Sequence, residues 1–222
     1  MEMFSPEFFS ALFSILVIDL VLAGDNAVVI AMAANRLPEN LRKKAVLYGT
    51  AGAVIIRVVM TLMAVYLLSI PFLQAVGGVI LIPIAIKLLK PSGDKHIEAA
   101  DSLGEAIKTI IIADAAMGID NVLGVAGAAG GSFMLVCIGL VISIPIVVGC
   151  SQLIGRLMDK WPVLIYLGAA ILGRTAGEMV IADKAVGPYL AELMGTTVPE
   201  IIPWAIAIAV CAIGYMMQKN KA

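Results

Sequence analysis

The chain has 222 residues, of which 61% are hydrophobic and 14% are charged, and its formal net charge is −1. A mean hydropathy of +1.04 excludes an ordinary soluble globular domain. A membrane-spanning helix needs about 20 apolar residues, so the composition predicts an all-α membrane protein with several spans. We expect a single transmembrane domain over residues 1–222, in the lipid bilayer of the cell membrane, with no nucleic-acid partner.

Polar breaks divide the chain into seven apolar segments, each predicted to be a transmembrane helix. They cover approximately residues 8–34, 45–69, 71–89, 107–129, 133–154, 163–182 and 201–217. We expect repeat one at 8–90, a polar cytoplasmic linker at 91–106, repeat two at 107–182, an outer loop at 183–200 and a seventh helix at 201–218. Within the outer loop, residues 189–194 are expected to form a short interfacial helix.

The basic residues predict the orientation in the membrane. With the N-terminus outside, 12 of the 15 lysines and arginines fall on the cytoplasmic side, and only Lys184 falls on the other side. Arg57 and Arg174 lie within the apolar segments. Because cytoplasmic loops carry an excess of Lys and Arg, we expect the N-terminus outside and the C-terminus inside.

A motif in the first apolar segment returns in the fourth. Residues 15–34 and 110–129 align without a gap, and both contain Asp-x5-Asp-Asn. The aligned pairs are Asp19 with Asp114, Asp25 with Asp120, and Asn26 with Asn121. A charged side chain at bilayer depth costs about 2.5–3.5 kcal/mol on insertion scales, so such residues usually serve function. Three spans per copy, an odd number, predict two inverted three-helix repeats with a site at their interface.

The spacing within the motif predicts interrupted helices. On a continuous helix Asp19 and Asp25 would point about 240° apart around the axis. Gly24 in the first copy and Gly118 in the second permit unwinding, which would turn both carboxylates inward and free backbone carbonyls. We therefore expect two broken helices that cross at the centre of the protein.

Oxygen ligands from these helices predict a metal-cation site. The six motif residues are joined by Glu178 of the sixth segment, which is either a seventh ligand or only the partner of Arg174, four residues earlier. The candidate ligands are Asp19, Asp25, Asn26, Asp114, Asp120, Asn121 and Glu178. All-oxygen sites favour Mg²⁺, Ca²⁺ or Mn²⁺ over Cu⁺ or Zn²⁺.

The intramembrane charges leave two questions open. Five acids face two arginines, so the excess of negative charge is larger than a divalent cation neutralises. One carboxylate that holds or exchanges a proton would balance the rest, which leaves proton coupling open. Arg57 and Arg174 either form structural ion pairs with these acids or act in gating.

Other chemistries have little support in the sequence. The isolated cysteines and the single histidine, His96, provide no zinc- or copper-site spacing. No phosphate-binding GxxxxGK[ST] motif is present, so ATP hydrolysis is not expected. An intramembrane aspartyl protease would need two carboxylates that share a proton, whereas this chain has two matched sets that each end in Asn. We expect neither an enzyme nor a prosthetic group.

The two motif copies, together with residues 168–179 (GAAILGRTAGEM), resemble the TerC family of integral membrane proteins, within the wider LysE-like exporters. The resemblance covers nearly the whole chain. It implies a seven-helix bacterial membrane protein of metal homeostasis, with manganese export as the leading activity. It also implies a link to the metalation of secreted metalloenzymes and, by the family name, to tellurium resistance. The six motif residues and Glu178 match the family positions.

Two classes of function are therefore expected. The first is a divalent-cation transporter, most of all for Mn²⁺ efflux. The second is a membrane scaffold that supports secreted metalloenzymes or the secretion machinery without transporting ions. In the second case, the outer loop at 183–200 would matter more than the aspartates.

Overall fold

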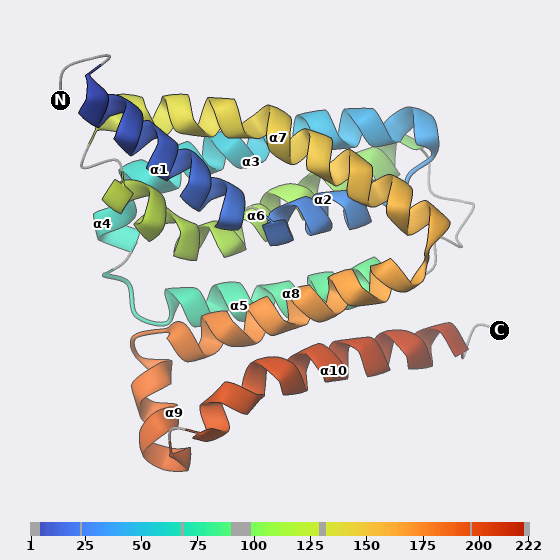
Figure 1. Ribbon diagram of the computed structural model, residues 1–222. Helices are drawn as coiled ribbons and strands as arrows, with labels where there is room; N and C mark the ends of the chain where they lie inside the picture. Colours follow the sequence, from blue (N-terminus) through green and yellow to red (C-terminus); the bar gives the residue numbers. More distant parts are fainter. Residues whose placement is uncertain are drawn as a thin grey trace.

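The computed structural model describes residues 5–22, 24–67, 69–89, 99–128, 132–195 and 197–219, and the regular structure in these ranges is entirely helical (Figure 1). The all-α prediction is confirmed. The helices are α1 (Pro6–Leu22), α2 (Gly24–Asn35), α3 (Glu39–Leu62), α4 (Ala64–Leu67), α5 (Leu73–Leu89), α6 (Ala99–Ala128), α7 (Phe133–Lys160), α8 (Val163–Ala182), α9 (Val186–Met194) and α10 (Thr197–Lys219).

Several helices have the length and apolar character that a bilayer requires. Among the described residues, four stretches of at least 18 residues qualify: Glu39–Leu62, Met134–Lys160, Val163–Ala182 and Glu200–Met217. Shorter apolar stretches occupy Phe8–Val17 and Leu73–Leu89. The helices therefore form a multi-span bundle.

Some helix ends differ from the expected segments. Helix α6 begins at Ala99, so the second part of the expected 91–106 linker is helical, and α7 continues to Lys160. Charged residues end an apolar run without ending a helix, because Lys and Glu are good helix formers. Residues 90–98, with His96, lie outside the described ranges. The expected short helix in the outer loop is α9, which ends at Gly195 with φ of 77°.

The helices pack in a definite pairing. Helix α3 packs along α6, α7 packs along α1 and α2, and α5 packs along α8, whose other side is covered by α10 (Figure 1). The largest buried cluster joins α2, α5, α6 and α8 through residues such as Met32, Leu81, Ile110 and Leu172. The second half of the first segment thus lies at the centre of the bundle.

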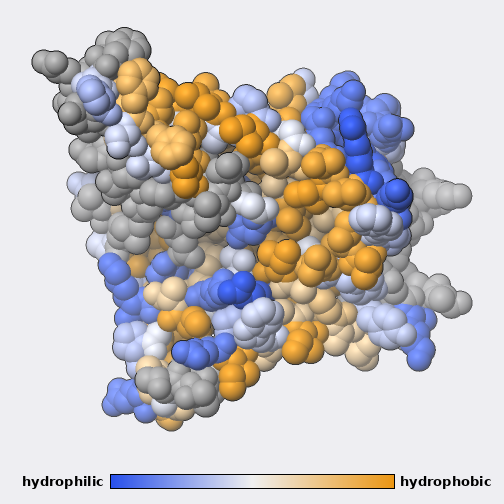
Figure 2. Space-filling view, viewed as in Figure 1, coloured by the Kyte–Doolittle hydropathy of each residue, from blue (hydrophilic) through white to orange (hydrophobic). Residues whose placement is uncertain are grey.

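The two ends of the bundle differ in charge. The C-terminus, the α2–α3 turn and the ends of α5 and α7 gather at one end, and the N-terminus lies at the other (Figure 1). At the first end Arg42 of α3 pairs with Asp159 of α7, and Lys87 of α5 pairs with Glu105 of α6. Figure 2 shows hydrophobic side chains over much of one face, with hydrophilic ones at this end, near the middle and at the lower part of the other end.

Glycines allow α8 to approach its neighbours closely. A Cβ added at Gly177 would lie 2.5 Å from the Cα of Pro203 on α10, and one added at Gly78 of α5 would meet the carbonyl oxygen of Ala176. In both places the obstacle is backbone, which cannot rotate away. Gly177 and Gly78 therefore serve close helix packing.

We expect Gly78→Ala and Gly177→Ala to lower the free energy of unfolding by about 1–3 kcal/mol through overpacking. Thermal unfolding in detergent measures the change. Gly149→Ala and Gly155→Ala are the matched controls, because a Cβ at either position meets no atom within 4 Å. Equal stability of all four variants would show that the close contacts do not limit the packing.

A buried carboxylate fixes the turn between α8 and α9. Asp183 is only 3% exposed. It accepts hydrogen bonds from the backbone N–H groups of Ala185 (2.9 Å), Val186 (3.2 Å) and Ala75 at the start of α5 (3.3 Å). Burial raises the pKa of this carboxyl, but the backbone donors outweigh burial, so the pKa lies below its usual value of 3.8.

The stabilisation from Asp183 should therefore depend on pH. A lowered folded-state pKa gives stability that is complete above the unfolded value of 3.8 and is lost as the pH falls through the folded value. We expect wild-type protein to unfold at a higher temperature than Asp183→Asn at neutral pH, and the difference to shrink below pH 3.8. A difference that persists unchanged at low pH would contradict this account.

Candidate metal centre

The first copy of the motif lies where one helix ends and another begins. Helix α1 ends at Leu22, α2 begins at Gly24, and the two axes point in different directions (Figure 1). The backbone N–H of Asn26 donates to the Asp25 carboxylate at 2.9 Å, as expected at a helix N-terminus, where the first N–H groups lack carbonyl partners. Gly24 is exposed and has open space around it. This geometry agrees with the predicted interruption.

The second copy of the motif differs, and the prediction of a second broken helix is wrong. Helix α6 runs without interruption from Ala99 to Ala128, through Gly118. One glycine inside a helix costs only about 1 kcal/mol relative to alanine. The packing of α6 along α3 outweighs that cost, and a Cβ at Gly118 would meet only Met60 at an ordinary distance.

The Asp25 carboxylate connects α2 to α8. One oxygen accepts the Asn26 N–H, and the other accepts the hydroxyl of Thr175 at 3.4 Å. The side chain is half-buried. Sequence reasoning missed Thr175, although a hydroxyl between Arg174 and Glu178 in an apolar span was a signal for it.

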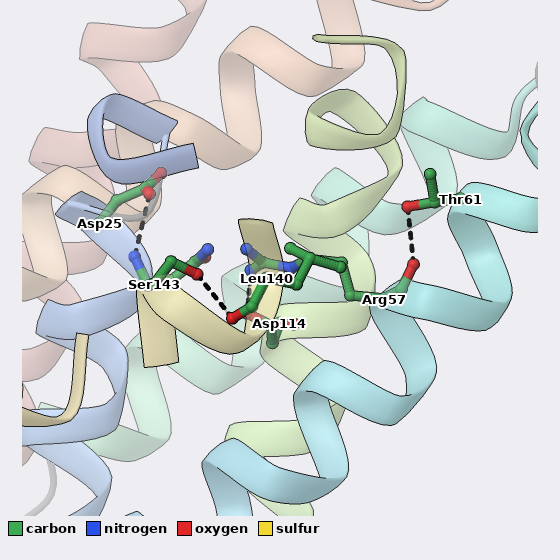
Figure 3. A network of polar contacts seen from close by, with 7 residues as sticks. Asp25, Arg57, Thr61, Asp114, Leu140 and Ser143 are labelled. Carbon is green, nitrogen blue, oxygen red and sulfur yellow. Dashed lines mark hydrogen bonds and ion pairs between the residues drawn. The ribbon is translucent and has the colours of Figure 1, made fainter. Parts of the chain in front are cut away.

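Asp114, the partner of Asp19 in the alignment, is in a buried ion pair. Its carboxylate accepts a hydrogen bond from Arg57 of α3, and both side chains are only 7% exposed (Figure 3). Figure 3 also shows Ser143 of α7 beside this pair, with its hydroxyl donating to the carbonyl of Leu140. Pairing with an acid was one of the two roles left open for Arg57, and the structure shows such a pair with an aspartate of the second motif copy.

Buried amide atoms of both motif copies lack hydrogen-bond partners among the described residues. Asn26 is 2% exposed, and neither its Oδ1 nor its Nδ2 has a hydrogen-bond partner in the described part of the chain. The same holds for Nδ2 of Asn121, which is 5% exposed. A buried polar atom without a partner costs about 1–3 kcal/mol, so it requires an explanation.

Glu178 lies near this centre but is bound to Arg174, as expected from their spacing. The two form an ion pair on α8, each with somewhat less than half of its side chain exposed. The Arg174 guanidinium also lies 5.0 Å from the ring centre of Trp204 on α10. Thr175, which binds Asp25, is three residues before Glu178, about one helical turn.

The described side chains do not complete a cluster of metal ligands. Within them, no group of three His, Cys, Asp or Glu residues lies close enough to hold an ion. The side chains of Asp19 and Asp120 are outside the described part of the structure. The structure thus places Asp25, Asn26, Asp114 and Asn121 on the packed helices α2 and α6, and the full ligand set remains a prediction.

Comparison with known proteins supports the resemblance. The model of the integral membrane protein TerC family matches residues 4–222. The chain belongs to the TerC family. The uncharacterized membrane protein YjbE of Bacillus subtilis is 44% identical over 217 residues, which cover 97% of this chain and 99% of YjbE.

Two further Bacillus subtilis relatives of this TerC family member are more distant. The uncharacterized membrane protein YkoY is 26% identical over 90% of this chain and 69% of its own length. The uncharacterized membrane protein YceF is 28% identical over 94% and 82%. No solved structure matches the chain. This TerC protein is thus a multi-pass integral membrane protein.

The Arg57–Asp114 pair should show strong coupling in a double-mutant cycle. Removing one partner of a buried pair costs about 3–5 kcal/mol because it leaves the other charge unpaired. We therefore expect Arg57→Gln and Asp114→Asn to destabilise the TerC protein singly, and the double variant to lose much less than their sum. Unfolding free energies in detergent measure the coupling.

The exposed pair of Lys87 and Glu105 provides the matched control for this cycle. Its side chains are 39% and 50% exposed, so the same neutralising substitutions should show a coupling below about 1 kcal/mol. If the losses in the free energy of unfolding from Arg57→Gln and Asp114→Asn simply add in the double variant, the two charges do not stabilise each other.

Proposed function

We propose that this chain transports a divalent metal cation across the cell membrane, with Mn²⁺ as cargo and export as the direction. The observation that carries the proposal is the buried Asn26 amide, which makes no hydrogen bond to the described residues and follows Asp25 at the start of α2. An amide oxygen and a carboxylate in such a place suit a hard cation, which would satisfy them both. The choice of Mn²⁺ and of export rests on the TerC family resemblance.

We place the transport site at the interface of two inverted repeats. The helix packing supports this: α3 packs along α6 of the other repeat, and α7 packs along α1 and α2, as a two-fold relation between the repeats requires. In this arrangement α5 and α8 correspond to each other, and they pack together. The chain then has seven spans, with α1 and α2 forming the first and α10 the seventh.

The proposed orientation places the N-terminus outside the cell. The helix ends that carry most of the basic residues gather at the end of the bundle that holds the C-terminus, which supports a cytoplasmic location for that end. At the other end, a pocket of about 200 Å³ lies between the α4–α5 and α8–α9 turns. Ile119, the neighbour of Asp120 in the second motif, contributes to its wall. We propose this pocket as the outer approach to the site.

The proposed ligands come from both halves of the chain. They are the side-chain oxygens of Asp19, Asp25, Asn26, Asp114, Asp120 and Asn121, with Glu178 one turn away from the hydroxyl that binds Asp25. Rocking of one repeat against the other would expose this site first to one side of the membrane and then to the other. Proton exchange at one carboxylate would provide the coupling.

The second candidate is a membrane scaffold for secreted metalloenzymes or for the secretion machinery. Helix α9 favours it, because this outer helix has no buried residue and presents Tyr189, Leu193 and Met194 at the surface. Loss of function on substitution of the aspartates distinguishes a transporter from such a scaffold.

The test is cellular manganese in stressed cells that express the protein. We expect wild-type protein to lower cell manganese and Asp25→Asn to abolish this effect, because the neutral side chain removes charge from the site. Asp159→Asn is the matched control, since that carboxylate lies in an exposed pair at the end of α7. Export by Asp25→Asn equal to that of wild-type protein would reject the proposed site, whereas no effect of either protein on cell manganese would favour the scaffold.

A further inference from the structure

One buried arginine holds a carboxylate of the second motif copy. Arg57 is 6% exposed and pairs with Asp114 of the second copy. Arg57 therefore provides positive charge at the place where the proposed function needs a cation.

A cation that binds Asp114 must take the place of this arginine. The carboxylate is buried, and a charge in such a place needs a partner at all times. Arg57 and a metal ion both meet that need, and they repel each other in a region of low dielectric. The presence of one therefore weakens the binding of the other.

The structure offers Arg57 a second set of partners. A cavity of about 20 Å³, enough for one water molecule, is lined by Thr50, Arg57, Asp114 and Ser143. Thr50 is 4% exposed, and its hydroxyl makes no hydrogen bond within the described residues. It precedes Arg57 by seven residues, which places both on one face of α3, and helical side chains lean toward the N-terminus. The Thr50 and Ser143 oxygens can thus accept the guanidinium N–H groups.

We propose that Arg57 is a tethered competitor of the transported cation, which holds Asp114 until the metal displaces the guanidinium toward Thr50 and Ser143. This inference rests on the proposed function. It goes beyond that function because it assigns a role to Arg57, which is not one of the proposed metal ligands. Arg57 neutralises Asp114 between transport events and lowers the affinity for the cation, so that the cation can be released. Thr50 positions the displaced arginine.

The test is Mn²⁺ binding to the purified full-length protein in lipid nanodiscs, measured by calorimetric titration. Arg57→Gln removes the competitor, so the Kd for Mn²⁺ should fall by about tenfold or more. Thr50→Val keeps the shape but removes the acceptor of the displaced arginine, so the Kd should rise by about threefold to tenfold. Arg42→Gln, which removes a guanidinium from the exposed pair with Asp159, should leave the Kd unchanged.

The Kd for Mn²⁺ is expected to change in opposite directions in Arg57→Gln and Thr50→Val. This difference distinguishes competition from a purely structural role of Arg57. If Arg57 only holds the helices together, Arg57→Gln should bind Mn²⁺ more weakly or equally, and Thr50→Val should bind as wild-type protein does. Either result overturns the proposal. If Arg57→Gln does not fold, Thr50→Val decides by itself, since its hydroxyl has no partner in the described structure to lose.

The same experiment separates this inference from the proposed function. One outcome is that wild-type protein binds Mn²⁺, Asp25→Asn does not, and Arg57→Gln has the same Kd as wild-type protein. This outcome would reject the role of Arg57 as a competitor but would keep the proposed transport site. No binding of Mn²⁺, Ca²⁺ or Mg²⁺ by wild-type protein would reject both.

Discussion

The centre of the bundle depends on how charge is neutralised away from water. The ion pair of Arg57 and Asp114 connects α3 to α6 with both side chains buried. On α8, Arg174 pairs with Glu178 and lies over the ring of Trp204. Because a lone charge in this region would cost several kcal/mol, these contacts restrict how the helices can be arranged. The packing of α3 along α6 and of α8 along α10 is consistent with that restriction.

The two copies of the motif have taken different structures. In the first, Asp25 lies half-buried at the start of α2, with a backbone N–H and the Thr175 hydroxyl as donors. In the second, Asp114 lies in the middle of the continuous helix α6 and is held by Arg57. The Asp25 carboxylate thus accepts hydrogen bonds from uncharged donors, whereas the Asp114 carboxylate is paired with the positive charge of Arg57. This asymmetry suits a site in which one half receives an ion and the other half controls its affinity.

The proposed transport and the close packing of the helices make opposing demands on this fold. Glycines such as Gly78 and Gly177 bring α5, α8 and α10 into backbone contact, which favours their movement as a unit. Both amide atoms of Asn26 and the Nδ2 of Asn121, in contrast, are buried without hydrogen bonds to the described residues. Under the proposed function, these rigid helix pairs would rock around the polar centre. The stability of the surrounding contacts offsets the cost of that centre.

The sequence by itself determined the all-helical, multi-span class, the duplicated motif, the contact of Arg174 with Glu178 and the short helix α9. Each of these follows from composition or from spacing along one helix, which local geometry converts directly into structure. The tertiary structure alone decided that Arg57 pairs with Asp114, that Thr175 binds Asp25, and that α6 stays continuous through Gly118. These features depend on which helices face each other and on how far each helix is shifted along its axis relative to its neighbour. Spacing within a segment does not contain that information, because packing energy between distant segments outweighs the small preferences of single residues.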